Sequence, residues 1–178
     1  MSTKPKFFLL DAGPIIELHR IGLWRDVLDR ADIVVPRVIA EKEAEYWVRD
    51  DNSRRPIDVL GDAESGRLTI RDCDEAELRE TLELFDRAVQ QSVDPGELHA
   101  LALIRRWQGD PVPAFCSADR MAIVCLCLLG FSDAAASLEE LLRAVGFTVR
   151  LGRRFTTAKM TEWVADGRRR SLQDSGLA

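Results

Sequence analysis

The sequence predicts an α/β domain built on a mostly parallel sheet. Short apolar runs, such as 7–10 and 33–35, alternate along the chain with longer stretches in which apolar residues recur at helical spacing. Mostly short polar, glycine or proline segments join them, and this alternation is typical of βαβ units. The chain has 178 residues, of which 46% are apolar and 31% charged, so it is long enough to bury one substantial core.

The first part of the chain predicts two strands, each followed by a helix. In order they are strand 6–10, helix 13–28, strand 33–35 and helix 38–49. Pro14 stands in the first turn of the first helix, where its missing N–H costs no hydrogen bond. We expect this helix to continue past Gly22, and the second strand to end at Pro36.

The middle of the chain predicts a long loop before the pattern resumes. In order we expect loop 50–66 with one helical turn at 57–60, strand 68–70, helix 75–90 and helix 95–107. The last of these helices has a clear start at Asp94-Pro95-Gly96-Glu97. This segment supplies a capping residue, a proline at the first helical position and a glutamate at the third.

The last part of the chain continues the alternation to its end. In order we expect strand 114–117, helix 121–129, helix 137–145, strand 148–151 and helix 157–169. Gly130 ends the first of these helices, and Ser137 caps the second. No internal repeat and no low-complexity segment interrupts the pattern.

Composition excludes several classes of protein. The chain carries 25 Lys and Arg against 30 Asp and Glu, a net charge of −5, which excludes a uniformly basic nucleic-acid binder. The apolar content excludes a disordered chain, and four cysteines are too few for a disulfide scaffold. The cysteines lack CxxC spacing and the two histidines, His19 and His99, are isolated, so no zinc site is expected.

No segment has the character of a membrane or export signal. The longest apolar stretch, 121–131, is well below the roughly 20 residues that a spanning helix needs. The apolar run 7–10 is too short for the core of a signal peptide. We therefore expect a cytoplasmic, reduced protein without a membrane partner.

Four carboxylates lie at related places in the predicted fold. They follow strands, or begin the helices that come after them: Asp11, Glu41, Glu97 and Asp119. Each has a local explanation as a cap, a turn or a solvated surface residue. In an open α/β sheet, however, functional sites form at the carboxyl ends of the strands, so four such residues are expected to converge. Glu45 lies one helical turn beyond Glu41 and remains an alternative to it.

Converging carboxylates need a counter-charge. Two of them about 4 Å apart at an effective dielectric constant near 20 repel each other by about 4 kcal/mol. These motifs contain no lysine, and a hard divalent cation such as Mg²⁺ or Mn²⁺ prefers carboxylate oxygens. The sequence therefore predicts a metal site that hydrolyses phosphodiester bonds.

The order of these motifs resembles the PIN-domain nucleases. The four segments concerned are Phe7-Phe8-Leu9-Leu10-Asp11-Ala12-Gly13-Pro14, Val35-Pro36-Arg37-Val38-Ile39-Ala40-Glu41, Asp94-Pro95-Gly96-Glu97-Leu98-His99-Ala100 and Phe115-Cys116-Ser117-Ala118-Asp119. No single segment is specific. The resemblance depends on the ordered set of four with family-like spacing, and it covers roughly residues 5 to 150.

The resemblance implies a three-layer α/β/α sandwich around a sheet of four or five strands. It also implies a ribonuclease dependent on Mg²⁺ or Mn²⁺, of the kind found in VapC-like toxins, which form homodimers and are held by an antitoxin. Carried over to this sequence, Asp11, Glu41, Glu97 and Asp119 become the catalytic metal ligands, and Ser117 positions water or a ligand. The domain would span residues 1–150, with 151–178 as a basic, helical extension.

The sequence departs from the family pattern at three points. Glu97 stands where many members have Asp, and the second motif offers Glu43 and Glu45 beside Glu41. The chain is also longer than the compact toxins, in 50–66 and after 150. A PIN-like module that only binds or assembles, with weak or no nuclease activity, is the alternative function.

Other carboxylate-based folds fit less well. A haloacid-dehalogenase phosphatase needs Asp-x-Asp after the first strand, but Asp11 is followed by Ala12 and Gly13. An RNase H-like nuclease needs a second acidic residue close after the first, and a response receiver needs paired acidic residues before its first helix. Neither pattern is present.

The basic residues concentrate near the end of the chain. Residues 150–170 carry seven Arg and Lys against two Asp and Glu, a local charge of +5, which leaves −10 for the rest. This segment either follows an RNA backbone beside the acidic site or is a solvated or partner-binding helix. Further arginines flank the motifs at Arg37, Arg105, Arg106 and Arg120. His99 is expected to face away from Glu97 and receives no catalytic role.

Overall fold

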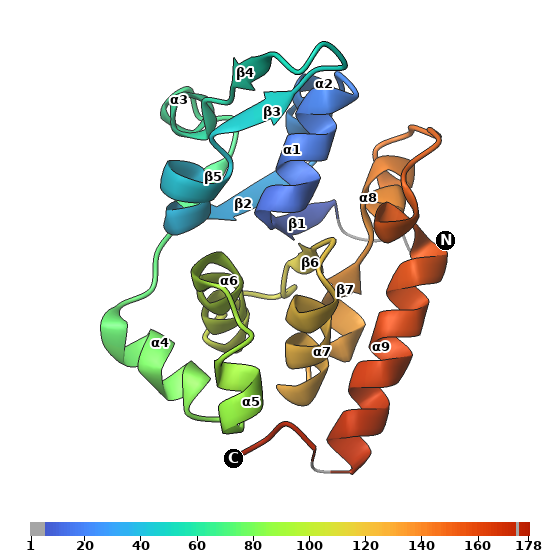
Figure 1. The fold of residues 1–178 in the computed structure, drawn as a ribbon. Coiled ribbons are helices and arrows are strands. Elements are labelled where there is room, and N and C mark those ends of the chain that lie inside the picture. The colour runs from blue at the N-terminus through green and yellow to red at the C-terminus, as the bar shows by residue number, and fades with distance from the viewer. Residues whose placement is uncertain (1–5, 174) are drawn as a thin grey trace.

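The structure is a computed structural model that describes residues 6–173 and 175–178. Within these residues, five parallel strands form a sheet in the order β5-β2-β1-β6-β7, with helices on both faces. The strands are β1 (Phe7–Leu10), β2 (Asp32–Pro36), β5 (Thr69–Arg71), β6 (Ala114–Cys116) and β7 (Ala135–Ala136). Figure 1 shows the resulting three layers, which confirm the predicted α/β/α sandwich with a parallel sheet.

The two faces of the sheet bury separate apolar clusters. In β1, Phe8 and Leu10 point to one face and Leu9 to the other, as the two-residue period of a strand requires. The first cluster is completed by α1 (Ala12–Arg20), α2 (Trp24–Leu28) and α8 (Leu138–Ala144). The second is completed by α6 (Pro95–Arg105), α7 (Arg120–Leu128) and α9 (Thr157–Leu172). Both faces of the central strands are therefore buried, which explains their nearly continuous apolar sequences.

Two predicted helices are each divided in two. The predicted helix 13–28 ends at Arg20 and resumes at Trp24, because Gly22 takes a φ of 75°, which a right-handed helix cannot contain. The predicted helix 75–90 is α4 (Glu75–Leu82) followed by α5 (Arg87–Gln90). Asp86 separates them, and its side chain accepts a hydrogen bond from the N–H of Val89 at 2.9 Å as the cap of α5.

The predicted helix 38–49 is wrong. A π-helical turn covers Ile39–Glu43, and the chain then forms a hairpin of β3 (Tyr46–Val48) and β4 (Arg54–Pro56). Tyr46, Trp47 and Val48 are residues that favour strands, and this preference outweighs the helical pattern of the preceding segment. The segment predicted as loop 50–66 accordingly contains β4 and a full helix, α3 (Val59–Glu64).

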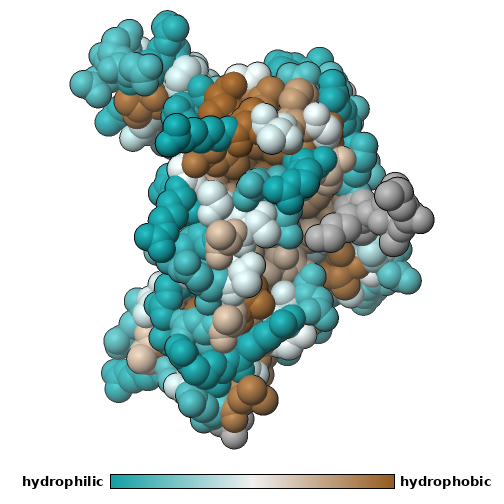
Figure 2. Space-filling view, turned by 90° about the vertical axis from the view of Figure 1, so that its right-hand side faces the viewer, coloured by the Kyte–Doolittle hydropathy of each residue, from teal (hydrophilic) through white to brown (hydrophobic). Residues whose placement is uncertain are grey.

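The predicted strand 148–151 is also wrong. Residues 148–151 have no regular secondary structure, and the edge of the sheet on this side is β7, which has only two residues. Figure 2 views the molecule from the side on which α8 and α9 lie in Figure 1. Hydrophilic side chains predominate over the lower half of this face, and hydrophobic ones gather near its upper end.

The helix predicted near the end of the chain is α9, and it extends to Leu172. It packs along α7, as Figure 1 shows, and contributes Met160 and Trp163 to the second core cluster. Beyond it, the N–H of Ala178 donates to the carbonyl of Leu84 at 3.0 Å. The helix α9 and the end of the chain at Ala178 thus pack against the rest of the fold. No helix in the described part of the chain is long and apolar enough to cross a membrane.

Candidate functional site

Asp11 lies at the carboxyl end of the central strand. It follows β1 directly and caps α1, with its Oδ1 accepting a hydrogen bond from the N–H of Ala12 at 2.7 Å. Its Oδ2 accepts a second bond from the hydroxyl of Ser117, also at 2.7 Å. The residue is only 8% exposed. Asp11 is thus buried at the edge of the sheet where the neighbouring strands β1 and β6 end.

Ser117 connects Asp11 with Asp119. Its side chain is buried, and its Oγ accepts a hydrogen bond from the N–H of Asp119 at 3.1 Å while donating to Asp11. Asp119 caps α7, because its Oδ1 accepts from the N–H of Met121 at 2.6 Å and from that of Ala122 at 3.3 Å. One hydroxyl therefore fixes two of the predicted site residues relative to each other.

Glu97 approaches the same place from α6. It lies in the first turn of the helix, and its Oε2 accepts a hydrogen bond from the N–H of Asp94 at 3.1 Å. The residue is 6% exposed. The proline and glycine before it start the helix, so the local sequence 94–97 is sufficient to direct this carboxylate inward.

Glu43, rather than Glu41, meets this group from the segment after β2. Its Oε1 accepts a hydrogen bond from the N–H of Gly96 at 2.9 Å. A Cβ at position 96 would lie 2.2 Å from the Oε2 of Glu43, so glycine is the residue that admits this carboxylate. Gly96 adjoins Glu97, and Glu43 therefore joins the cluster that we define as Asp11, Glu43, Glu97 and Asp119.

Glu41 and Glu45 lie outside this cluster. Glu41 is exposed, and its Oε1 accepts a hydrogen bond from the guanidinium of Arg37 at 3.3 Å. Glu45 is exposed as well, and its carbonyl pairs with the N–H of Ile57 at the base of the hairpin. The prediction that placed Glu41 among the ligands assumed an α-helix, in which residues 41 and 45 share a face. The π-helical turn followed by a strand changes that relation and brings Glu43 inward instead.

The carboxylates of the cluster repel one another. Burial is the largest cause that raises the pKa of Glu97 to about 8. The negative charges of Asp119, Asp11 and Asp94 act in the same direction, and the hydrogen bond from the N–H of Asp94 opposes them. Burial also raises the pKa of Asp11, and the charges of Asp119 and Asp94 act in the same direction. The pKa of Glu43 is raised by burial and by the charge of Asp11. Positive charge placed among these side chains would stabilise their ionised forms.

The donor set fits a hard divalent cation, although no closed coordination shell is present. Among the described residues, no three His, Cys, Asp or Glu side chains are arranged as a group that could hold a metal ion. Oxygen atoms of Asp11 and Asp119 are occupied as helix caps, which keeps these carboxylates directed at backbone N–H groups. Carboxylate oxygens without histidine or cysteine are nevertheless the ligands that Mg²⁺ and Mn²⁺ prefer.

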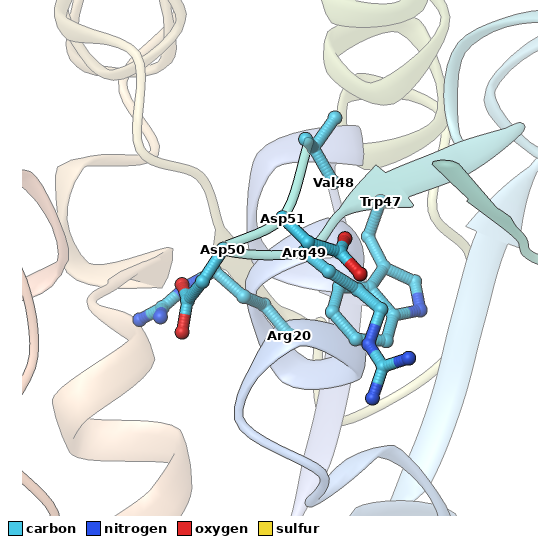
Figure 3. A pocket seen from close by; sticks show the side chains of 6 residues that line it. All are labelled: Arg20, Trp47, Val48, Arg49, Asp50 and Asp51. Atoms are coloured by element: carbon cyan, nitrogen blue, oxygen red, sulfur yellow. The ribbon is translucent and has the colours of Figure 1, made fainter. Parts of the chain in front are cut away.

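A separate hollow lies beside the hairpin. Its volume is about 410 Å³, and Figure 3 shows the side chains that line it, from the end of α1 and from β3 and the turn after it. Arg20 and Arg49 contribute positive charge, Asp50 and Asp51 negative charge, and Trp47 an aromatic ring. None of the predicted site residues lines this hollow.

Comparison of the chain with family models, with curated proteins and with solved structures found no match. The cluster of Asp11, Glu43, Glu97 and Asp119 is therefore the feature of the molecule that points to a function. Of the residues predicted from the sequence, Asp11, Glu97 and Asp119 lie in this cluster and Ser117 bonds to two of them, whereas Glu41 lies outside it; Glu43 was not predicted. The feature of the sequence that could have pointed to Glu43 was Gly96, because a glycine there leaves room for a carboxylate from elsewhere in the chain.

Proposed function

We propose that this protein is a Mg²⁺- or Mn²⁺-dependent endoribonuclease. The observation that carries the proposal is the convergence of Asp11, Glu97 and Asp119 at the carboxyl edge of the sheet, where burial and mutual repulsion raise the pKa of Asp11 and Glu97. Asp11 and Glu97 are buried and Asp119 is exposed, and a purely structural role would not require two carboxylates to be buried this close to a third. In an open α/β sheet, this edge is also where ligands bind.

In the proposed site, the metal would be held by Asp11, Glu97 and Asp119, together with Glu43 in the role that the sequence predicted for Glu41. These side chains are not arranged as a coordination shell in the structure, so cation binding would have to draw them together. When bound, Mg²⁺ or Mn²⁺ lowers the pKa of coordinated water and neutralises charge that develops on phosphoryl oxygens. Ser117 holds Asp11 and Asp119 in fixed relative positions through its two hydrogen bonds. Cation binding would also favour the ionised form of Glu97, so proton release is expected to accompany it.

The first experiment tests metal binding by thermal unfolding with and without Mn²⁺. We expect Mn²⁺ to raise the melting temperature of the wild type and to have little effect on Asp11→Asn. Asparagine can still accept a hydrogen bond from Ser117, so this variant removes the charge with little other change. Glu41→Gln is the matched control, because Glu41 is exposed and lies outside the cluster. An equal shift in wild type and Asp11→Asn would contradict the metal site.

The second experiment tests cleavage of RNA. We expect the purified wild type to cleave single-stranded or structured RNA with Mg²⁺ or Mn²⁺, and Asp119→Asn to be inactive. Asparagine is a good helix cap, so α7 should remain capped in the variant. If the wild type, freed of any partner, cleaves no RNA with either metal, the protein is a PIN-like module for binding or assembly instead.

A further inference from the structure

Three arginines surround the carboxylate of Asp166. Arg120 is the first residue of α7 and directly follows Asp119, whereas Arg169 and Arg170 lie near the end of α9. Arg120 and Arg169 donate hydrogen bonds to opposite oxygens of Asp166, and the Nε of Arg170 lies 3.6 Å from its Oδ2. Because α7 and α9 lie side by side, as Figure 1 shows, this group joins the C-terminal helix to the edge of the acidic cluster.

The group carries excess positive charge. Three guanidinium groups share one carboxylate, which leaves a charge of +2. The side chain of Asp166 is only 12% exposed, whereas those of Arg120 and Arg169 are 46% and 68% exposed. Asp166 therefore serves as a largely buried anchor. The side chains of Arg120 and Arg169 that it orients face the solvent, and that of Arg170 is 31% exposed.

The neighbouring carboxylates are engaged by other cations. Glu162 pairs with Arg153 and Lys159. Asp133 pairs with Arg168, whose guanidinium also bonds to the hydroxyl of Ser132. Among the ion pairs of the described residues, Asp166 is thus the acidic partner of Arg120, Arg169 and Arg170, and Glu162 and Asp133 pair with other cations.

We propose that Arg120, Arg169 and Arg170 form a phosphate clamp that holds an RNA phosphodiester beside the acidic cluster, an inference that rests on the proposed ribonuclease function. The planar guanidinium fork matches two phosphate oxygens at once, which a lysine cannot do. Because Arg120 adjoins Asp119 in the chain, a phosphate bound here lies next to the proposed metal site. The clamp also explains how a chain with a net charge of −5 attracts a polyanion at this one place.

The test is binding of a short fluorescein-labelled single-stranded RNA, measured by anisotropy in EDTA so that no metal-dependent cleavage occurs. We expect the double variant Arg169→Gln/Arg170→Gln to bind about tenfold more weakly than the wild type. Loss of two phosphate contacts should also reduce the slope of log K against log salt by about 1.4, since each contact to a single strand contributes about 0.7.

Two matched controls separate the clamp from general electrostatics and from misfolding. Arg168→Gln removes the same charge from the adjacent position of α9, but Arg168 pairs with Asp133, so its RNA affinity should stay within about twofold of the wild type. Arg169→Lys/Arg170→Lys keeps both charges and should restore the wild-type salt slope, because the slope counts neutralised phosphates. Thermal unfolding of every variant checks that α9 remains packed.

The outcomes distinguish this inference from the proposed function. If Arg168→Gln weakens binding as much as the double Gln variant does, or if the double Gln variant binds like the wild type, the clamp is wrong even where the wild type cleaves RNA. If binding depends on Arg169 and Arg170 but neither metal supports cleavage, the clamp stands and the ribonuclease proposal fails. Wild type that neither binds nor cleaves RNA would overturn both.

Discussion

Glu97 shows how a single buried carboxylate couples the site to the stability of the protein. Its pKa is about 8 in the folded chain, against 4.5 for an ordinary glutamate. Between these two pH values the unfolded chain has released the proton that the folded chain retains. The free energy of unfolding therefore falls as the pH rises through this window, and the contribution of Glu97 is fully present only below it.

We accordingly expect the wild type, in EDTA, to lose stability from pH 5 to pH 8 more steeply than Glu97→Gln. Each pKa unit corresponds to about 1.4 kcal/mol, so the difference between the two proteins should change by a few kcal/mol over this range. Urea denaturation at a series of pH values measures it. Glu41→Gln should retain the wild-type pH dependence, since Glu41 is outside the cluster. Parallel curves for the wild type and Glu97→Gln would show that Glu97 is ionised in both states.

Gly96 controls the position of Glu43. Replacing Gly96 should therefore affect metal binding much more than it affects the stability of the fold. In Gly96→Ala the new Cβ would meet the Oε2 of Glu43 at 2.2 Å, so the carboxylate must move away. The lost hydrogen bond costs about 1 kcal/mol, and the better helix propensity of alanine offsets a similar amount. We expect nearly unchanged unfolding in urea but a much smaller Mn²⁺-induced rise in melting temperature.

Single substitutions at Glu43 and Glu41 test which of the two glutamates contributes to the response to Mn²⁺. Glu43→Gln should reduce the response to Mn²⁺ as Gly96→Ala does, because both remove the same charge from the cluster, whereas Glu41→Gln should not. If Glu41→Gln abolishes the Mn²⁺-induced rise in melting temperature and Glu43→Gln preserves it, the metal ligand is Glu41, as the sequence predicted, and not Glu43. The structure would then have to change on metal binding to bring Glu41 inward.

At the scale of elements, the close approach of α7 and α9 depends on Gly167. A Cβ at position 167 would lie 2.6 Å from the Cβ of Cys127 and 3.2 Å from the Cα of Val124, so the two helices would have to separate. Overpacking of this kind typically costs about 1–3 kcal/mol. We expect Gly167→Ala to lower the free energy of unfolding by that amount in urea denaturation. Gly152→Ala is the control, because its Cβ would meet only Phe155 at an ordinary 3.8 Å.

The sequence predicted the central elements well and the peripheral ones poorly. The strands β1, β2 and β6 are continuous apolar runs that are buried on both faces, so their identity does not depend on their neighbours. The edge strand β7 is only Ala135–Ala136, whose residues carry no strand signal, and it exists because it pairs with Phe115 and Cys116. In 148–151, which is irregular backbone, Leu151 packs against the first core cluster and Val149 is exposed.

The same distinction applies to the candidate site. Asp11, Glu97 and Asp119 follow from strand ends and helix caps, which the local sequence determines. Glu43 depends on the π-helical turn and on contact with Gly96, 53 positions away, and no periodic pattern reports either of them. Residues whose roles arise from a tertiary contact are therefore the ones that sequence reasoning misses here.

For the whole molecule, the decisive question is whether residues 1–150 form a domain without the C-terminal helix. The sequence suggested such a boundary, but α9 places Met160 and Trp163 in the core that α6 and α7 share. Exposing a buried methionine or tryptophan site costs about 2–5 kcal/mol each, and a domain of this size has only about 5–15 kcal/mol in total. Removal of α9 should thus leave too little stability for a cooperative fold.

We therefore expect a chain that ends at residue 150 to show no cooperative thermal transition in near-ultraviolet circular dichroism and to bind hydrophobic dyes. Leu172→Ala is the control within the same helix: its side chain is 88% exposed, so its removal should change the free energy of unfolding by less than about 0.5 kcal/mol. A shortened chain that unfolds cooperatively would show that α9 is an accessory to a complete domain. Its loss would then affect RNA binding through Arg169 and Arg170 and leave the acidic cluster intact.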